Sequence, residues 1–324
     1  MKVLLTFDVE IWCNDWAQLD QRFPASFQRY VWGRSAQGDY ALPKTLEILA
    51  RHGLKGVFFV EPLFSARFGA EHLRTIVRLI ADAGQDVQLH LHPEWVDEIS
   101  PPLIRDNLHK RQHLTHYNLD EQSALIGHAA RLLRAAGADS LNAFRAGSFA
   151  CNRDTFRALR ANGIHLDSSL NACYAVSAAD MTGDGAHDRA SMIEGVASFP
   201  VSVFRDGFGR ARPAQIAGCS AAELESAMTQ AQQMGARQFV IVSHNFEMLR
   251  PGSSEPDRIV VQRFEALCRF LEARRDLMPT ATFDECAVAD EAGAQRPHVG
   301  WVATARRHVE QLQRRLPPHT FVHS

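Results

Sequence analysis

The chain has 324 residues, of which 46% are hydrophobic and 22% are charged, and its formal net charge is −2. This composition is typical of a globular protein with a large core, and the near-neutral charge gives no reason to expect nucleic acid as a partner. The sequence contains no run of about 18 apolar residues, so we expect no membrane span. Its length suits two domains or one large (β/α) barrel.

The cysteines are scattered, with no CxxC pair and no zinc-finger spacing. There are six of them: Cys13, Cys151, Cys173, Cys219, Cys268 and Cys286. In a chain of this length such spacing indicates free thiols in a reducing compartment rather than a disulfide framework. The N-terminal apolar run reaches Asp8 after only a few residues, which is too short for a signal peptide. We therefore expect a soluble, cytoplasmic protein.

The first strand is expected in the apolar run Met1–Phe7, which ends at the carboxylates Asp8 and Glu10. Residues two apart on an extended strand lie on the same face, so the two acids form a pair at the carboxyl end of a buried strand. Acidic residues also follow strands as turn or cap residues, so the pair alone does not establish a site.

Aromatic residues are frequent in the irregular segment 11–40, which predicts a loop or short helices over the end of the first strand. Beyond it the pattern predicts a helix over Pro43–His52, a buried strand over Lys55–Val60 and a helix over Ala70–Ala83. Proline at the start of a helix and glycine after its end are the expected boundaries.

A pair of histidines, His90 and His92, ends the strand expected over Asp86–His90. Extended backbone places both imidazoles on one face, and Pro93 stops the strand. A single histidine is more often a core or surface residue, but this arrangement favours two metal ligands. The histidines of the polar stretch 96–119 are instead expected to be solvated: His109, His113 and His116.

Strands and helices continue to alternate along the rest of the chain. We expect helices over Asp120–Ala136, Arg153–Asn162, Ala221–Met234 and Pro256–Ala273, and strands over Leu141–Phe144, Ile164–Leu166, Ala197–Phe204, Gln238–Val242 and Pro279–Phe283. One domain over residues 1–285 is therefore expected, with residues 286–324 forming a peripheral C-terminal helix and tail. Such alternation is typical of the α/β class with a parallel sheet.

Unusual polar residues recur at the carboxyl ends of these strands. Asp8 and Glu10 follow the first strand and the two histidines the third, and the later positions are Arg145, Asp167 and His244. In a (β/α) barrel the carboxyl ends of the strands meet at one face, which carries the active site. The pattern therefore predicts that these side chains converge.

The residue types then indicate the chemistry. One carboxylate and two imidazoles can hold a divalent ion with an open position, a set typical of hydrolytic zinc, which makes water more acidic and polarises a carbonyl. The other carboxylate can act as general base and a separate histidine as general acid. We expect Arg145 to keep the base ionised and Asp167 to orient His244. These groups suit metal-assisted hydrolysis of an amide or ester.

Five ordered segments resemble the motifs of a known family: Thr6-Phe7-Asp8-Val9-Glu10, His90-Leu91-His92-Pro93, Phe144-Arg145-Ala146-Gly147, Asp167-Ser168-Ser169-Leu170 and Val242-Ser243-His244. The family is that of the polysaccharide deacetylases, the NodB-homology group or carbohydrate esterase family four. Within it the chain resembles the WalW-like branch of lipopolysaccharide biosynthesis. The resemblance extends from about residue 3 to residue 285.

The resemblance implies an irregular (β/α) barrel and the removal of an N- or O-acetyl group from a sugar or glycan intermediate. Because we expect the protein to stay in the cytoplasm, a lipid-linked or nucleotide-linked intermediate is the expected form of the substrate. By the resemblance Asp8 is the base, Arg145 its partner, His244 the acid and Asp167 the residue that tunes the acid. The expected cofactor is one divalent metal, with Zn²⁺ as the default. Its expected ligands are Glu10, His90 and His92, and the expected substrate-binding residues are Trp95, Ser148 and Asn245.

The chain departs from the family pattern at two places. Val9 stands where the family has a second, adjacent aspartate, and Glu10 is the expected replacement. The family's two histidines are separated by three residues and those here by one, so the second ligand is either His92 or Glu94. A hydrolase of non-sugar C–N bonds and a catalytically silent carbohydrate-binding barrel are the alternatives. The presence of both a base and an acid argues against the silent barrel.

Overall fold

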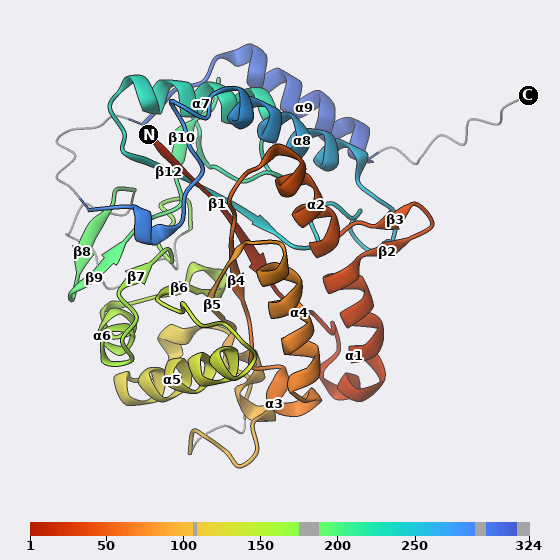
Figure 1. The fold of residues 1–324 in the computed structure, drawn as a ribbon, viewed down its shortest axis with the longest axis vertical. Coiled ribbons are helices and arrows are strands. Elements are labelled where there is room, and N and C mark those ends of the chain that lie inside the picture. Colours follow the sequence, from red (N-terminus) through yellow and green to blue (C-terminus); the bar gives the residue numbers. More distant parts are fainter. Residues whose placement is uncertain (106–108, 175–187, 289–295, 316–324) are drawn as a thin grey trace, which may run out of the picture.

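The core of the molecule is a curled sheet of eight strands, ordered β12-β1-β4-β5-β6-β7-β9-β8. The structure is a computed structural model that describes residues 1–105, 109–174, 188–288 and 296–315. Neighbouring strands are parallel except at one edge, where β8 runs antiparallel to β9. The sheet forms a half-barrel with β12 and β8 at its edges (Figure 1). The predicted α/β class and irregular (β/α) barrel are confirmed.

The strands at the centre of this sheet are buried and strongly apolar, as expected for parallel strands that are covered on both faces. The eight strands of the sheet are β1 (Lys2–Val9), β4 (Val57–Val60), β5 (Asp86–Leu91), β6 (Ala143–Ala146), β7 (Leu166–Asp167), β8 (Ser191–Ile193), β9 (Val196–Ser198) and β12 (Gln238–His244). Two small hairpins lie outside it, β2 (Arg34–Ser35) with β3 (Gly38–Asp39) and β10 (Val203–Arg205) with β11 (Ala211–Pro213).

Helices surround the sheet (Figure 1). They are α1 (Leu19–Phe27), α2 (Leu42–His52), α3 (Ser65–Phe68), α4 (Ala70–Asp82), α5 (Leu119–Ala135), α6 (Arg153–Ala161), α7 (Ala221–Gln233), α8 (Arg258–Ala273) and α9 (Trp301–Arg315). Capping boxes begin three of them, at Asn118, Asn152 and Ser220. In such a box two otherwise unpaired backbone N–H groups find side-chain acceptors, so these helices start where the sequence provides the cap.

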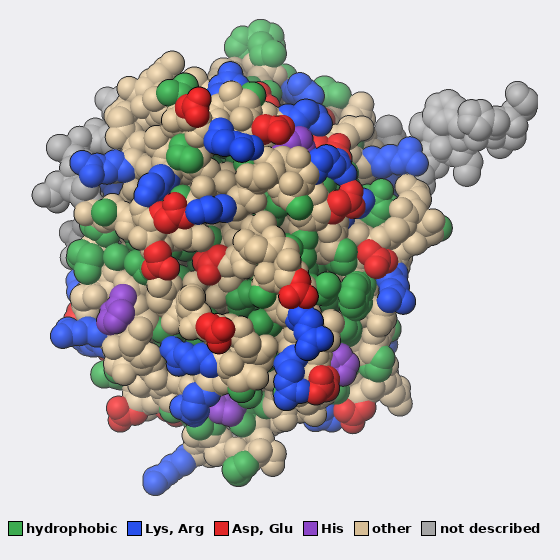
Figure 2. Space-filling view, viewed as in Figure 1, with side chains coloured by type: hydrophobic (Ala, Val, Ile, Leu, Met, Phe, Trp, Pro, Cys, Tyr) green, Lys and Arg blue, Asp and Glu red, His purple; other side chains and the backbone are tan. Residues whose placement is uncertain are grey.

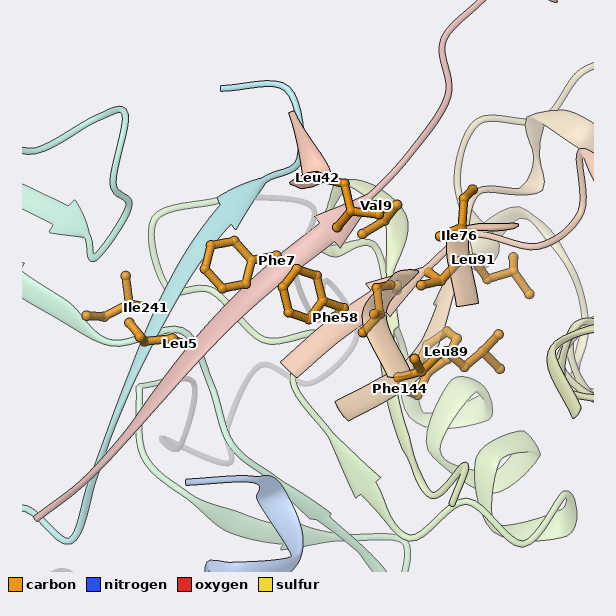
Figure 3. Packing of buried hydrophobic residues seen from close by; sticks show 14 of the residues in the cluster. Leu5, Phe7, Val9, Leu42, Phe58, Ile76, Leu89, Leu91, Phe144 and Ile241 are labelled. Carbon is orange, nitrogen blue, oxygen red and sulfur yellow. The ribbon is translucent and has the colours of Figure 1, made fainter. Parts of the chain in front are cut away.

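The sheet has two apolar faces because successive side chains of a strand point to opposite sides. On the outer face Leu5 and Phe7 of β1 belong to the large core under the helices, and Phe7 stacks on Phe58 with ring centroids 4.8 Å apart (Figure 3). On the inner face a smaller cluster fills the half-barrel: Leu4, Val57, Phe59, Ala143, Phe199, Val240 and Phe283. The next inner positions toward the carboxyl ends carry polar residues.

Two of the predicted strands are wrong. The run Ala197–Phe204 is divided between β9 and β10, with Pro200 at the break, because proline has no N–H to donate to a sheet ladder. In the run Pro279–Phe283, Thr280 forms an isolated parallel bridge with Val3, and a short 3-10 helix begins at Phe283. A capping box at Thr282 favours that helix.

The C-terminal helix α9 is attached to the rest of the chain by a buried ion cluster. Arg307 donates from Nε to Glu223 Oε1 at 3.0 Å and from a terminal nitrogen to Asp206 Oδ2 at 2.9 Å, and all three side chains are at most 1% exposed. The helix lies beside α7 (Figure 1). Of the predicted C-terminal segment 286–324, residues 289–295 and 316–324 lie outside the described residues, and the division at residue 285 stays a prediction.

The surface agrees with the near-neutral charge: on the face shown in Figure 2, basic and acidic side chains are interspersed. Within the described part of the chain, no helix is both long and apolar enough to cross a membrane. All six cysteines are free thiols.

We predict that Arg307→Ala lowers the free energy of unfolding by about 3–5 kcal/mol, because Glu223 would stay buried without its cation and Asp206 would keep only the longer contact with Arg212, at 3.5 Å. The matched control is Arg306→Ala on the same helix, whose side chain is 64% exposed and should contribute within about 0.5 kcal/mol. Urea unfolding measures both. Equal effects of the two substitutions would contradict the assignment.

Candidate active site

The register of the sheet brings the predicted site residues together. Asp8 of β1 is the direct neighbour of His244 on β12, and His90 of β5 is the neighbour of Arg145 on β6. All four lie at the carboxyl ends of their strands, at inner-face positions beyond the apolar cluster. The predicted convergence is therefore observed for these four residues, and Glu10 joins them just beyond β1.

A carboxylate and two imidazoles form the centre of the site. Glu10 Oε1 lies 2.9 Å from His90 Nε2 and 3.0 Å from His92 Nε2. The three ligand atoms lie within 4.8 Å of one another, and all three residues are buried. Asp8, Glu10 and His244 form a second, overlapping group with the same spacing.

The hydrogen bonds of the two histidines show which ring nitrogens face the centre. His90 Nδ1 donates to the carbonyl oxygen of Arg145 at 2.7 Å, and His92 Nδ1 lies 3.3 Å from Glu94 Oε2. Both Nδ1 partners are acceptors, so each ring can carry its proton on Nδ1, which leaves the Nε2 lone pair free to bind a cation beside the Glu10 carboxylate. Three acceptors that face each other in a buried place fit a cation, and this donor set suits zinc.

Other residues hold these groups in place. The Trp12 indole donates to Glu10 Oε2 at 2.6 Å and packs edge-on against the ring of His92. Gly147 is needed because a Cβ there would lie 2.6 Å from the His92 ring. Glu94 contacts the far nitrogen of His92, which is the usual place of a carboxylate behind a metal-binding histidine. Of the two alternatives for the second ligand, the geometry therefore favours His92.

The proposed base, Asp8, is held by a buried arginine. Arg145 is fully buried and donates to Asp8 Oδ1 at 2.7 Å. Its other nitrogens donate to the carbonyl oxygen and the hydroxyl of Ser168, at 3.0 and 2.8 Å. The guanidinium also lies 4.4 Å above the Phe59 ring, so each of its three nitrogens donates a hydrogen bond and its face makes a cation–π contact.

The proposed acid, His244, faces Asp8 across a short gap. Its Nε2 lies 4.0 Å from Asp8 Oδ2, and its side chain is 24% exposed, so the site opens to solvent at this residue. Its Nδ1 bonds Glu247 Oε1 at 2.9 Å. Burial lowers the pKa of His244, but the hydrogen bond and charge of Glu247, together with Glu10 and Asp8, raise it to about 9.

The expectation that Asp167 orients His244 is wrong. Leu166 and Ala197 pack against the inner cluster, so their strand neighbours Asp167 and Ser198 point to the opposite face. Asp167 accepts hydrogen bonds from the backbone and side chain of Ser169 and from Ser198. Burial raises its pKa to about 6. Its place beside His244 is taken by Glu247.

Two of the three predicted substrate-binding residues are structural. Trp95 is 2% exposed and packs edge-on against Trp16, so its ring is not available for a sugar. Asn245 is 1% exposed, and its amide clamps the backbone of Glu10 through bonds of 3.2 and 3.4 Å. Ser148 is half-buried at the end of β6 and has a left-handed φ of 55°, a strained conformation typical of functional loops. Its substrate role stays a prediction.

The sequence analysis missed Glu247 and Trp12 as members of the site. Trp12 lies two residues after Glu10, and the aromatic segment that contains it was expected over this end of the first strand. Glu247 follows His244 by three residues in a turn. A carboxylate at that spacing was a signal, but a turn has no regular geometry from which a contact can be read.

Comparison with known proteins gives matches among solved structures. No family model and no curated protein matches this chain. A provisionally assigned polysaccharide deacetylase from Mycobacterium smegmatis is similar with a TM-score of 0.55 and 20% identity, over 92% of this chain and 94% of that chain. This chain has the polysaccharide-deacetylase fold. The resemblance predicted from the five motifs is confirmed at this level, and the WalW-like branch stays a prediction.

Two further solved structures are similar at lower scores. A family 4 carbohydrate esterase from Streptomyces lividans has a TM-score of 0.45 and 14% identity, over 89% of this chain and 98% of that chain. A carbohydrate esterase family 4 pseudoenzyme from Bacillus anthracis has a TM-score of 0.40 and 14% identity, over 86% of this chain and 62% of that chain.

We predict that the purified protein binds one divalent ion per chain and that His90→Ala loses it, because a carboxylate and one imidazole remain. Trp12→Phe should keep the ion but weaken its affinity about 10–100-fold, because Glu10 loses the indole hydrogen bond. The control is His116→Ala, an exposed histidine. Elemental analysis and calorimetric zinc titration measure these effects. A stoichiometric ion in His90→Ala would refute the ligand set.

Proposed function

We propose that this protein is a metal-dependent deacetylase that hydrolyses the acetyl group of an N-acetylated sugar or glycan intermediate. The observation that carries the proposal is the placement of Asp8 and His244, with 4.0 Å between Oδ2 and Nε2, beside the cluster of Glu10, His90 and His92. A general base and a general acid thus face one reaction centre from adjacent strands.

In this proposal Asp8 accepts the proton of the attacking water. One of its oxygens accepts the hydrogen bond from Arg145, and the other faces His244 and the open side of the site. Arg145 is positioned by Ser168, and its rigid fork keeps the carboxylate in one orientation. The base is therefore pre-oriented before substrate binds, which is a requirement for efficient proton transfer.

His244 acts as the acid that protonates the leaving amine, or the leaving alcohol of an O-acetyl group. Its pKa of about 9 means that the ring carries two protons at neutral pH, and Nε2–H points toward Asp8 and the solvent-exposed side. Because Nδ1 is bonded to Glu247, Nε2 is the nitrogen that is available to the substrate.

Glu10, His90 and His92 would hold the divalent ion, with zinc as the default. A bound ion acts as a Lewis acid that polarises the acetyl carbonyl and makes a water molecule more acidic. Trp12 holds Glu10, Glu94 holds His92, and the carbonyl oxygen of Arg145 holds His90, so the three side chains are already oriented toward one point.

The substrate class rests on the motifs and the fold. By its WalW-like motifs the reaction would belong to lipopolysaccharide biosynthesis in the cytoplasm, on a lipid-linked or nucleotide-linked sugar. Trp95 contributes no stacking surface to this proposal because it is buried.

We predict that Asp8→Asn and His244→Ala each lower kcat about 10²–10⁴-fold, because each removes one proton-transfer group. Both variants should keep the bound ion, since neither residue belongs to the Glu10–His90–His92 set. Acetate release from an N-acetylated chito-oligosaccharide measures the rate, and elemental analysis measures the ion. Unchanged turnover in both variants would contradict the mechanism.

Chelation separates the alternatives. Acetate release that stops on chelation and returns with zinc supports the deacetylase. A tightly bound ion without acetate release from any acetylated sugar would favour a hydrolase of non-sugar C–N bonds. A chain that binds sugar, holds no ion and releases no acetate would be a silent binding barrel.

A further inference from the structure

Glu247 lies in the turn after β12 and is the hydrogen-bonding partner of His244. Its Oε1 lies 2.9 Å from His244 Nδ1 and accepts a second bond from Gln215 Nε2 at 2.6 Å. Its Oε2 accepts the hydroxyl proton of Ser243 at 2.7 Å. The side chain is 9% exposed, so the carboxylate is held by three donors in a nearly dry place.

The donors that hold Glu247 belong to the same strand as His244 or pair with that strand. Ser243 precedes His244 on β12. Gln215 lies in a segment that adds to the free edge of β12: Val242 donates to the carbonyl oxygen of Ala214 at 2.9 Å and accepts from Ile216 N at 3.2 Å. The carboxylate therefore keeps a constant position relative to the imidazole, because one rigid sheet edge supports both.

We propose that Glu247 is the positioning residue of the acid: its hydrogen bond to Nδ1 orients the His244 ring so that Nε2 faces Asp8 and the open side of the site. This inference rests on the proposed function of His244. It assigns to Glu247 the part that the family motifs gave to Asp167. Asp167 instead orders the turn that leads into Ser168, the residue that holds Arg145. Asp8 and His244 are thus positioned by different residues, Arg145 and Glu247.

The charges around His244 determine the direction in which its pKa moves when Glu247 is replaced. Three carboxylates face it: Glu247 from the turn after β12, Asp8 from β1, and Glu10 from the segment beyond β1. Glu247 is the one of these to which His244 is hydrogen-bonded in the described part of the chain, and it raises the pKa of His244 most. Without its charge the pKa falls, so the acid form is lost at a lower pH.

The test is the pH dependence of kcat/KM for acetate release from an N-acetylated chito-oligosaccharide by the zinc-loaded enzyme. We expect Glu247→Gln to move the alkaline limb down by about one pH unit or more and to lower kcat about tenfold. Glu247→Asp, which keeps the charge, should restore part of the shift. Asp167→Asn should lower the rate without moving the alkaline limb, because Asp167 acts on the side of Arg145.

A second measurement does not depend on turnover. Titration of the ¹⁵N-labelled imidazole of His244 by NMR, in the same zinc-loaded proteins, reports its pKa and its tautomer; His244→Gln identifies the signals. We expect a lower pKa and a loss of the Nδ1–H tautomer preference in Glu247→Gln only. A pKa that Glu247→Gln leaves unchanged, or that Asp167→Asn lowers equally, would overturn the inference.

The two measurements also separate this inference from the proposed function. If His244 titrates lower in Glu247→Gln but the wild-type protein releases no acetate, the proposed function fails and the His244–Glu247 coupling stands. If the wild-type protein is an active deacetylase and Glu247→Gln shifts neither the alkaline limb nor the NMR titration, the function stands and the inference fails.

Discussion

The fully buried guanidinium of Arg145 is the constraint on which the rest of the site depends. A cation without exposure is costly unless every polar side of it is paired. Here Asp8 of β1 and Ser168, just beyond β7, supply the acceptors, and the Phe59 ring of β4 lies against its face. The arginine therefore ties together the carboxyl ends of four strands, β6 that carries it and the three that satisfy it. Asp8 is held as a consequence of that packing.

The half-barrel separates an apolar interior from a polar rim along the same strand faces. Leu4, Phe59 and Val240 fill the inner face at depth, and the inner positions nearer the carboxyl ends carry Asp8, His90 and His244. Residues two apart on a strand point to the same face of the sheet, so the inward-facing side chains of each strand include both apolar core residues and the polar residues of the site. The buried rings of Phe59, Phe199 and Phe283 in the inner cluster give one side of the charged groups a low local dielectric, which strengthens their interactions.

In the proposed mechanism the site has three parts, namely the base Asp8, the acid His244 and the ion-binding residues, and different neighbours hold each part. Ser168 and the turn ordered by Asp167 support the base, and Gln215 and Ser243 support the acid through Glu247. Trp12 and Glu94 support Glu10 and His92. Because Glu247 bonds His244, Gln215 and Ser243, its substitution leaves the hydrogen bond between Arg145 and Asp8 in place.

The sequence by itself determined the fold class, most of the helices and strands, and the convergence of six polar side chains at one end of the sheet: Asp8, Glu10, His90, His92, Arg145 and His244. These predictions hold because hydrophobic period and strand-end position are local properties, and parallel strands align their carboxyl ends. Only the tertiary structure decided that Trp95 and Asn245 are buried, that Asp167 faces away, and that Glu247 reaches the acid. Which residue of the two-residue strand β7 faces inward depends on its register with distant strands. The turn that carries Glu247 has no repeating geometry, so its path also depends on packing between distant segments.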